Sequence, residues 1–330
     1  MFGARHRATD EAGVFVLSPF TLAPHVNLPL VRSSATLHLA RHLSWPYFGN
    51  KPLAGTPFSD PDLVLCGAPT LTEVALSLNG RLSLYRLADD SSLFDAVTPA
   101  ARQAEAEAIS RFDGIIVTSS ILEERVRKLK ARQVLLVSNG VDRAFFERPA
   151  PVPAIMTHLQ EPRILYAGAI ESWFDWNFIL HAAEARPNYS FVIVGRLNAP
   201  PPAPLPPNVE IVGQRVYADM PAFMQAATVG IIPFALSDRD EAVRAINPLK
   251  LYEYLAAGLP VVSSVRAPNL DCRGLFIYSR KEDILTCLDE AIALRRSSTK
   301  VSLPKDVDWA EILKDMLKKI GLPYGASERG

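Results

Sequence analysis

The segment NPLKLYEYLAAGLPVVSS, residues 247–264, contains the pattern that decides the fold. Asn247 is a good N-cap and Pro248 suits the first position of a helix. One apolar face follows from the spacing of three and four residues between Leu251, Tyr254 and Leu255. Gly258 predicts a left-handed stop, and Pro260 leads into a buried strand. A helix that turns at once into a buried strand is typical of an α/β protein.

Two charged residues lie near the start of this predicted helix. Lys250 is in the first turn, where the helix dipole disfavours a cation unless an anion is close by. A phosphate there would satisfy both the free N–H groups and Lys250. Glu253, about one turn further on, can accept hydrogen bonds from ribose hydroxyls. The alternative is a surface helix whose lysine and glutamate are both solvated, and the spacing alone favours neither interpretation.

Composition bounds the class of protein. The chain has 330 residues, of which 48% are hydrophobic and 21% charged, and this fits a globular protein large enough for two domains. The formal net charge is +0, so no overall field indicates a nucleic-acid partner. The three cysteines, Cys66, Cys272 and Cys287, show no zinc-ligand spacing and suit a reducing cytoplasm. With no secretory pattern and no apolar run of about 20 residues, we expect a protein of the cytoplasm or of a membrane surface.

Strand and helix patterns alternate through the first half of the chain. We expect helices over 99–111 and 121–131. Buried strands are predicted over 13–20, 62–69, 82–89, 114–120 and 133–140. Strands separated by helices imply βαβ units and a parallel sheet.

The proline-rich segment 147–162 is interpreted as an interdomain linker, after which the alternation restarts. Strands are predicted over 163–170, 190–196, 209–214, 229–234, 260–264 and 274–279. Helices are predicted over 176–185, 220–226, 248–257, 281–294 and 309–320, and a stiff loop over 198–208. The sequence thus predicts two doubly wound α/β domains, residues 1–150 and 151–330, with a ligand cleft at the carboxyl ends of their strands.

Several strand ends in the second half carry residues suited to a nucleotide. Gly168 lets a ligand approach the backbone, and Arg196 could clamp a phosphate, although a surface arginine is the alternative. Gln214 offers an amide that can read a base edge. Phe234 could line the cleft or belong to the core. The sequence has no GxGxxG, P-loop, GxSxG or HExxH motif.

In the first half, Asp89 and Asp90 follow a predicted strand. One of these carboxylates could act as a general base on a hydroxyl if burial raises its pKa. The alternative is a turn or a helix start, since aspartate favours both.

Taken together, these segments resemble the GT-B glycosyltransferases over about residues 80–320. The motifs that carry the resemblance, in chain order, are YRLADD, VTSS, SNGVD, YAGAI, FVIVG and NPLKLYEYLAAGLPVV. The chain is similar in particular to the xanthan-type glucuronosyltransferases and to bacterial family-4-like enzymes.

This resemblance implies two Rossmann-like domains, an acceptor-binding one followed by a donor-binding one, with a C-terminal helix that crosses back. It implies retaining or inverting transfer from a UDP- or GDP-sugar without a metal or cofactor, and with no nucleic-acid partner. Lys250 would meet the diphosphate and Glu253 the ribose. The other members of the implied donor set are Gly168, Arg196, Gln214, Phe234, Asn247 and Leu249. Asp89, with Asp90 beside it, falls where the xanthan-type enzymes place their candidate base, which would imply inversion.

Three features depart from the family pattern. Many retaining relatives carry a second glutamate eight residues before the equivalent of Glu253, where this chain has Ala245. The usual Gly-Arg-Gly with a following lysine is reduced to Gly195–Arg196 before a proline loop. The N-terminal half is also shorter than in relatives, so we expect either an abbreviated acceptor domain or a misplaced start site.

Acceptors in this group are often lipid-linked sugars, as well as glycans. The basic run 125–132 and the basic and aromatic segment 37–48 could rest on an anionic membrane, and a solvated helix face is the alternative. Two other functions remain open on the same scaffold: a nucleotide-sugar epimerase, and a nucleotide-sugar-binding protein that has lost catalysis.

Overall fold

The computed structural model describes ten parts of the chain, and all structural statements below refer to them. They are residues 5–8, 14–18, 58–78, 80–90, 99–128, 131–235, 246–267, 270, 272–297 and 299–323. Contacts divide the chain into two compact units, Met1–Leu136 and Val137–Gly330, which we call the first and second unit. Each unit has its own sheet, and each is described by itself.

The first unit contains a four-stranded parallel sheet in the order β3-β4-β5-β6. Its strands are β3 (Leu63–Cys66), β4 (Leu82–Leu87), β5 (Gly114–Val117) and β6 (Val134–Leu136). Its helices are the 3-10 turn η3 (Pro69–Leu71), α3 (Thr72–Ser77), α4 (Pro99–Ile109) and α5 (Ser120–Lys128). Strands and helices alternate as the sequence predicts, and every strand of this sheet was predicted.

The prediction that the strand over 13–20 joins this parallel sheet is wrong. Strand β2 (Phe15–Ser18) pairs antiparallel with β1 (Arg5–Ala8), and the two form a separate two-stranded sheet. Only six residues join these strands. A parallel connection needs a crossover of about a dozen residues or more, so this short link permits the antiparallel pairing alone.

The second unit contains a six-stranded sheet in the order β12-β11-β10-β7-β8-β9, with all neighbouring strands parallel. The strands are β7 (Arg163–Ala167), β8 (Ser190–Val194), β9 (Val209–Gly213), β10 (Val229–Ile232), β11 (Val261–Ser263) and β12 (Leu275–Ile277). All six were predicted from the sequence. Residues 198–208, each of which the structure describes, form neither helix nor strand, as expected.

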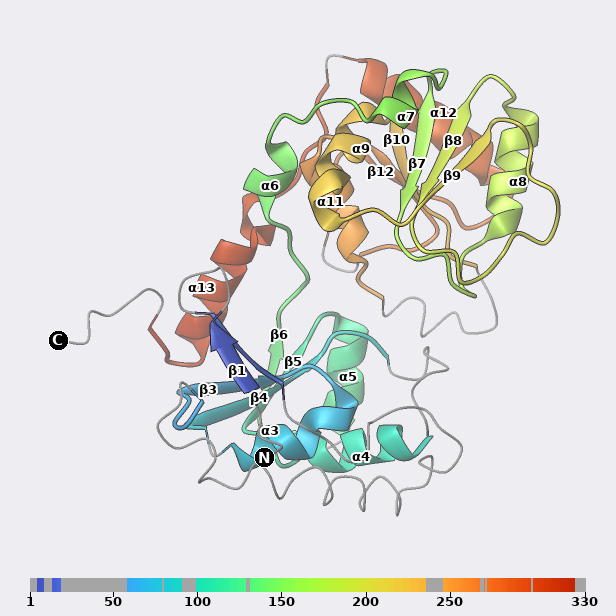
Figure 1. Ribbon diagram of the computed structural model, residues 1–330. Helices are drawn as coiled ribbons and strands as arrows, with labels where there is room; N and C mark the ends of the chain where they lie inside the picture. The colour runs from blue at the N-terminus through green and yellow to red at the C-terminus, as the bar shows by residue number, and fades with distance from the viewer. Residues whose placement is uncertain are drawn as a thin grey trace. The chain divides into compact units, whose positions relative to one another are not determined.

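Helices cover both faces of this sheet (Figure 1). On one face, α8 (Trp176–Ala185) and α12 (Asp283–Arg296) pack over one apolar cluster. On the other, α9 (Met220–Ala226) and α11 (Leu249–Ala256) pack over a second. Because helices cover both faces of the sheet, every residue of β8 and β10 is buried.

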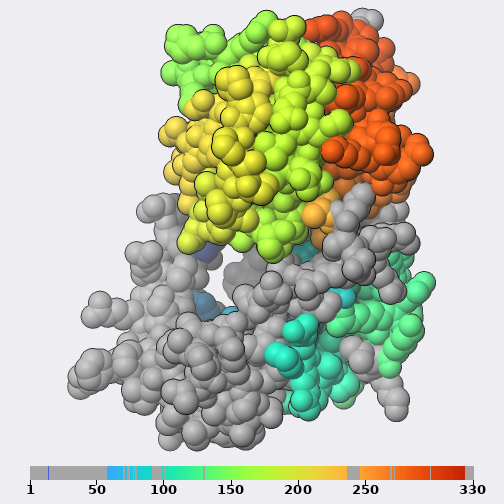
Figure 2. Space-filling model, turned by 90° about the vertical axis from the view of Figure 1, so that its right-hand side faces the viewer, coloured from blue at the N-terminus to red at the C-terminus, as the bar shows by residue number. Residues whose placement is uncertain are grey.

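Figure 2 shows the first of these faces, with the yellow-green segment that contains α8 beside the orange-red segment that contains α12. The two helices are joined at the surface by an ion pair between Arg186 and Asp289, whose atoms Nη2 and Oδ2 lie 2.6 Å apart. Residues about one hundred positions apart in the sequence therefore lie side by side.

The strand order places a topological switch point between β7 and β10. From β7 the chain runs outward through β8 and β9, and from β10 it runs outward the other way through β11 and β12. In open sheets of this kind, ligands bind beyond the carboxyl ends of the strands at the point where the order reverses. The residues that follow β7 and β10 are therefore the first to inspect for a site.

The second unit also includes the short helices α6 (Arg143–Glu147) and α7 (Ala154–Thr157), the 3-10 turns η5 (Tyr217–Asp219) and η6 (Lys305–Val307), and the helix α13 (Trp309–Lys319). The proline-rich segment 147–162 contains α7, whose Met156 is buried in the core of this unit. The chain around Val141 is held to the start of α13, since its N–H donates to the carbonyl of Val307 and its carbonyl accepts from the N–H of Trp309.

Glycines stand at the ends of β7, β8 and β9, and those of β7 and β8, Gly168 and Gly195, let the chain approach closely. Gly168 donates its N–H to the carbonyl of Val194, and Gly195 donates to the carbonyl of Gly213. A Cβ on Gly195 would lie 1.8 Å from the carbonyl oxygen of Gly168, so no other residue fits there without a backbone shift. Gly213 has φ +78 but nothing within 4 Å of an added Cβ.

Replacing Gly195 by alanine is expected to lower the free energy of unfolding by about 3 kcal/mol, because a backbone overlap adds to an unfavourable φ. Gly213→Ala is the matched control, with an unfavourable φ alone and an expected cost of about 1–2 kcal/mol. Urea unfolding of the two variants checks this difference. Equal losses would show that the overlap at Gly195 relaxes freely.

Candidate functional site

The ammonium group of Lys250 lies at the switch point of the second unit. Its Nζ donates to the hydroxyl of Tyr166 at 3.1 Å and lies 4.6 Å from the centre of that ring. It also lies 5.3 Å from the ring centre of Phe234. Because Tyr166 is near the end of β7 and Phe234 follows β10, the cation sits at the carboxyl ends of the two strands where the order reverses.

Gly168 makes room for this lysine. A Cβ on Gly168 would lie 2.6 Å from Nζ and 3.1 Å from Cε of Lys250. The Tyr166 hydroxyl donates its own hydrogen to the carbonyl of Ala169 at 2.8 Å, which leaves its oxygen free to accept from Lys250. The missing side chain predicted to admit a ligand therefore admits the lysine that would hold one.

The charge of Lys250 is poorly compensated within the described residues. No carboxylate oxygen among them lies within 4.0 Å of Nζ, and the aromatic faces of Tyr166 and Phe234 are its nearest polarisable partners. Burial lowers the pKa of Lys250 to about 8, and the charge of Glu253 opposes this only in part. An anion bound here would restore the solvation that the ammonium group has lost.

The predicted N-cap of α11 is wrong by one residue. The helix begins at Leu249, and Pro248 occupies the N-cap position with an extended backbone and no side-chain cap. Asn247 precedes a proline, which disfavours the helical region for it. Its buried side chain instead accepts from the hydroxyl of Tyr252 at 2.7 Å, while its carbonyl accepts from the side chain of Asn139. No capping side chain therefore accepts from the N–H groups of the first turn. These groups and the positive end of the helix dipole favour an anion at this position.

Glu253 lies one turn further along α11, on the same side as Lys250. Its Oε1 accepts a hydrogen bond from the hydroxyl of Tyr217 at 2.8 Å. Burial raises the pKa of Glu253, while the Tyr217 hydrogen bond and the charge of Lys250 oppose the increase. A cation and a carboxylate that follow one another along the helix could hold the diphosphate and the ribose of one nucleotide.

The remaining predicted donor residues divide by exposure. Phe234 is buried and donates its N–H to the Ser264 hydroxyl at 2.9 Å, so it supports the site as core. Arg196, Gln214 and Leu249 are all exposed. Arg196 and Gln214 follow the glycines at the ends of β8 and β9, at the same edge of the sheet as Lys250.

The two aspartates of the first unit differ in their partners. Asp90 forms an ion pair with Arg125 of α5, which holds its carboxylate as part of the local structure. Burial raises the pKa of Asp89, with the charge of Arg86 opposing the increase. A more basic carboxylate suits proton transfer, so the structure distinguishes Asp89 from Asp90 as the candidate base.

Sequence reasoning missed four residues that shape this region: Asn139, Tyr166, Tyr217 and Tyr252. Tyr166 and Tyr252 lie within a predicted strand and a predicted helix, where a buried tyrosine is typical of the core, and both are buried. Asn139 lies in the SNGVD motif, which gives no indication of a partner for its side chain. Tyr217 had no signal except its place three residues after Gln214, since its partner Glu253 is 36 residues away.

Several predictions fall outside the described residues or remain untested. Ala245 and the segment 37–48 lie outside them. Of the basic run 125–132, Arg125 pairs with Asp90, and Arg127 pairs with Glu123 at 2.6 Å. In the described ranges, no group of three His, Cys, Asp or Glu side chains is arranged to hold a metal ion. A search of the same ranges finds no helix with the length and apolar character to span a bilayer.

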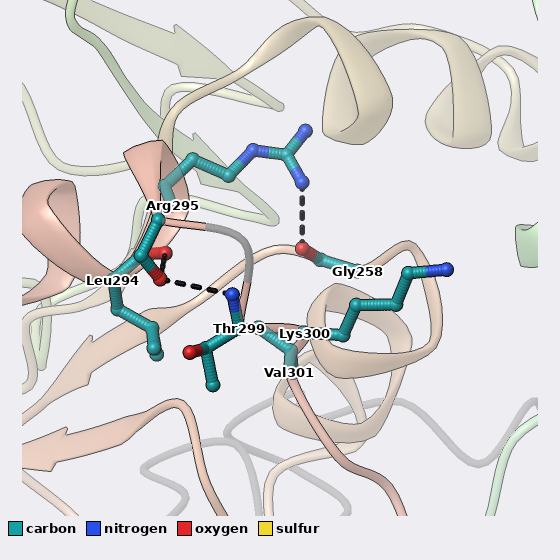
Figure 3. A pocket seen from close by; sticks show the side chains of 7 residues that line it. Gly258, Leu294, Arg295, Thr299, Lys300 and Val301 are labelled. Carbon is teal, nitrogen blue, oxygen red and sulfur yellow. Dashed lines mark hydrogen bonds between the residues drawn. The ribbon is translucent and has the colours of Figure 1, made fainter.

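A hollow of about 390 Å³ lies at the opposite end of α11 from Lys250 (Figure 3). It is lined by Gly258, Leu294, Arg295, Ser297, Thr299, Lys300 and Val301. The guanidinium of Arg295 donates to the carbonyl of Gly258 at 2.8 Å, and the Ser297 hydroxyl donates to the carbonyl of Leu294 at 2.8 Å. Two of its polar groups therefore brace the ends of α11 and α12, and the hollow is separate from the lysine site.

Comparison with known proteins is consistent with this geometry. Residues 161–287, which include Gly168, Lys250 and Glu253, match the family described as glycosyl transferases group 1. The chain is 26% identical over 249 residues to a Bacillus subtilis (strain 168) protein named as a candidate teichuronic acid biosynthesis glycosyltransferase. That match covers 67% of this chain but only 60% of the relative.

Solved structures agree on the fold. A sucrose-phosphate synthase from Thermosynechococcus elongatus aligns with a TM-score of 0.64 and 17% identity, covering 91% of this chain and 82% of that one. The Anabaena protein HepE, solved in complex with UDP-glucose, aligns with a TM-score of 0.56 and 14% identity, covering 79% and 78%. The predicted resemblance to the GT-B glycosyltransferases is confirmed, as is the α/β fold built from two Rossmann-like parallel sheets.

Because a buried, unneutralised ammonium costs folding free energy, Lys250→Met is expected to stabilise the ligand-free protein by about 2 kcal/mol at pH 7. Lys250 has a folded pKa of about 8, below its ordinary 10.5, so the folded protein binds fewer protons between these values. The cost is full below pH 8 and fades as the pH rises toward 10.5. Urea unfolding at pH 7 and pH 10 should therefore show the advantage of the variant shrinking. A variant less stable than the parent at pH 7 would contradict this description of the site.

Proposed function

We propose that this chain, a GT-B-fold protein with a glycosyl transferases group 1 domain at residues 161–287, transfers a sugar from a nucleoside diphosphate donor to a hydroxyl of a glycan or lipid-linked acceptor. The observation that supports this most is the position of Lys250, a partly buried and desolvated cation at the switch point of the second sheet. A nucleoside diphosphate supplies the anion that this position lacks.

Lys250 and the start of α11 would act on the leaving group. When the bond between the anomeric carbon and the diphosphate oxygen breaks, negative charge grows on that oxygen. The ammonium of Lys250 and the N–H groups of the first turn of α11 are already in place to stabilise it, and a preorganised donor set of this kind lowers the barrier most. Glu253 would hold the ribose hydroxyls, and Gln214 would face the base.

Asp89 would act on the acceptor. Its carboxylate takes the hydroxyl proton while the acceptor oxygen bonds to the anomeric carbon and the nucleoside diphosphate leaves. A direct displacement of this kind inverts the configuration at that carbon. The raised pKa of Asp89 favours this role, since a stronger base removes the proton more readily.

The choice of donor and acceptor classes in this proposal is based on what the similar proteins bind or are named for. HepE was solved with UDP-glucose bound, which makes UDP-sugars the first donors to test and GDP-sugars the second. The Bacillus subtilis relative is named for teichuronic acid biosynthesis, which favours a role in polysaccharide assembly. The proposal includes no metal or cofactor. It also includes a cytoplasmic location, with the acceptor met at the membrane surface if that acceptor is lipid-linked.

Lys250→Ala is expected to weaken UDP-sugar binding by about 100-fold and to lower kcat, because the charge that develops on the diphosphate loses its buried cation. Thermal shift over a panel of UDP- and GDP-sugars identifies the donor, and calorimetry measures the loss. Lys314→Ala, which removes an exposed lysine of α13, is the matched control and should bind as the parent does. A parent that responds to no nucleotide, together with an unaffected Lys250→Ala, would overturn the proposal.

Asp89→Asn is expected to reduce transfer by at least about 100-fold while donor affinity stays within about twofold of the parent, because only the proton acceptor is lost. Asp90→Asn, which breaks the ion pair with Arg125, should retain transfer at a modest cost in stability. NMR of the product is expected to show an inverted anomeric centre. Full transfer activity in Asp89→Asn would show that Asp89 is not the general base. A parent protein that binds the donor but transfers no sugar would favour the alternative, a binding protein that has lost catalysis.

A further inference from the structure

We propose that Tyr217 is a positioning residue for Glu253, and that the pair makes the site selective for ribonucleotides over nucleotides that lack the 2′ and 3′ hydroxyls. This inference rests on the proposed function, because it assumes a nucleoside diphosphate at Lys250. What it adds to the proposed ribose contact of Glu253 is Tyr217, to which neither the sequence nor the similar proteins assign a role.

The Tyr217 ring is fixed from one side by other aromatic rings. It stacks on Phe145 with ring centres 5.3 Å apart and planes 2° apart. Its edge meets the ring of Phe146 at 5.9 Å and 87°. Phe146 is fully buried, and the N–H of Phe145 is capped by the Asp142 side chain at 3.0 Å. These ring contacts hold the Tyr217 hydroxyl in position beside Glu253. Tyr217 as a whole is 58% exposed.

This contact leaves the carboxylate of Glu253 with capacity for a ligand. A carboxylate has two oxygens and about four sites for accepting hydrogen bonds. The Tyr217 hydroxyl uses one site on Oε1, at 2.8 Å, and fixes the orientation of the group. Oε2 and the remaining site on Oε1 are then directed as a pair, which matches the two neighbouring hydroxyls of a ribose.

Charge favours the same role. Glu253 must be ionised to accept from two hydroxyls, and burial alone works against ionisation by raising its pKa. The hydrogen bond from Tyr217 favours the ionised form and offsets part of the burial effect. Because tyrosine donates without adding a positive charge, the carboxylate keeps its full attraction for a neutral diol.

The loop that carries Tyr217 is uncrowded where it leaves β9. A Cβ on Gly213 would meet nothing within 4 Å. Gln214 and Val216 of the same loop are exposed, Val216 by 66%. On α11, Lys250 and Glu253 are three residues apart and so lie on one side of the helix. A nucleoside diphosphate whose ribose is bound by Glu253 and whose diphosphate is bound by Lys250 would therefore lie along α11.

The chain offers a matched control for the tyrosine. Tyr189 also donates its hydroxyl to a carboxylate, Oδ1 of Asp289, at 3.0 Å. That pair lies on the face of the sheet covered by α8 and α12, away from Lys250. Tyr189→Phe therefore removes the same chemical group from a similar surface pair that has no ligand to orient.

The experiment compares the calorimetric affinities of UDP and 2′,3′-dideoxy-UDP for the parent, Tyr217→Phe and Tyr189→Phe. We expect the parent to prefer UDP by about tenfold or more, the gain of a charged hydrogen bond to a diol. Tyr217→Phe should lose most of this preference by weakening UDP alone, and Tyr189→Phe should keep it. Phe145→Ala, which removes the ring that supports Tyr217 and leaves the hydroxyl in place, should lower the preference in part.

Tyr217→Phe with an unchanged preference, or with equal losses for both nucleotides, would overturn the positioning role. These results differ from a failure of the proposed function, in which the parent binds neither UDP nor GDP. UDP binding that is lost in Lys250→Ala but indifferent to Tyr217→Phe would retain the donor site and reject only the role of Tyr217.

Discussion

The candidate site is built around one unfavourable interaction: the partly buried Lys250 ammonium has lost solvation and has no carboxylate oxygen within 4.0 Å in the described part of the chain. The sheet order places a switch point between β7 and β10, and the lysine fills it. Gly168 leaves space for its side chain, and the Tyr166 hydroxyl oxygen accepts a hydrogen bond from its ammonium group. An unpaired ammonium group lowers the stability of the free protein, and a bound anion would offset this loss. The position of Lys250 therefore favours a role in ligand binding over a structural role.

The supporting contacts explain how the site keeps its shape without that ligand. The Asn247 side chain is bound by Tyr252 and its carbonyl by Asn139, so the turn before α11 is fixed while the helix start stays uncapped. The Tyr217 hydroxyl does the same for Glu253. In the first unit, Arg125 pairs with Asp90 and leaves Asp89 as the carboxylate whose pKa burial raises. In each case one residue makes a structural contact, and the role proposed above belongs to its neighbour.

The sequence predicted the sheets well because each strand of the two parallel sheets is a short apolar run bounded by turn residues. It failed for β2, since an apolar run does not identify its partner, and the short link to β1 decided the pairing. The sequence also predicted the N-cap at Asn247, which is wrong. Capping propensity does not indicate that the Tyr252 hydroxyl donates a hydrogen bond to the Asn247 side chain. Lys250 could be singled out from the helix dipole alone. Tyr166 and Tyr217 could not, because their roles come from contacts with residues 84 and 36 positions away.

The most direct test of the account is the pKa of the Lys250 ammonium, measured by NMR of ¹³C-labelled lysine, with the signal assigned by its loss in Lys250→Arg. We expect a value of about 8 in the free protein. Saturating UDP should raise it above 10, because a bound diphosphate stabilises the charged form. A value near 10.5 in the free protein, unchanged by UDP or GDP, would contradict the claim that this lysine is a buried cation kept for an anionic ligand.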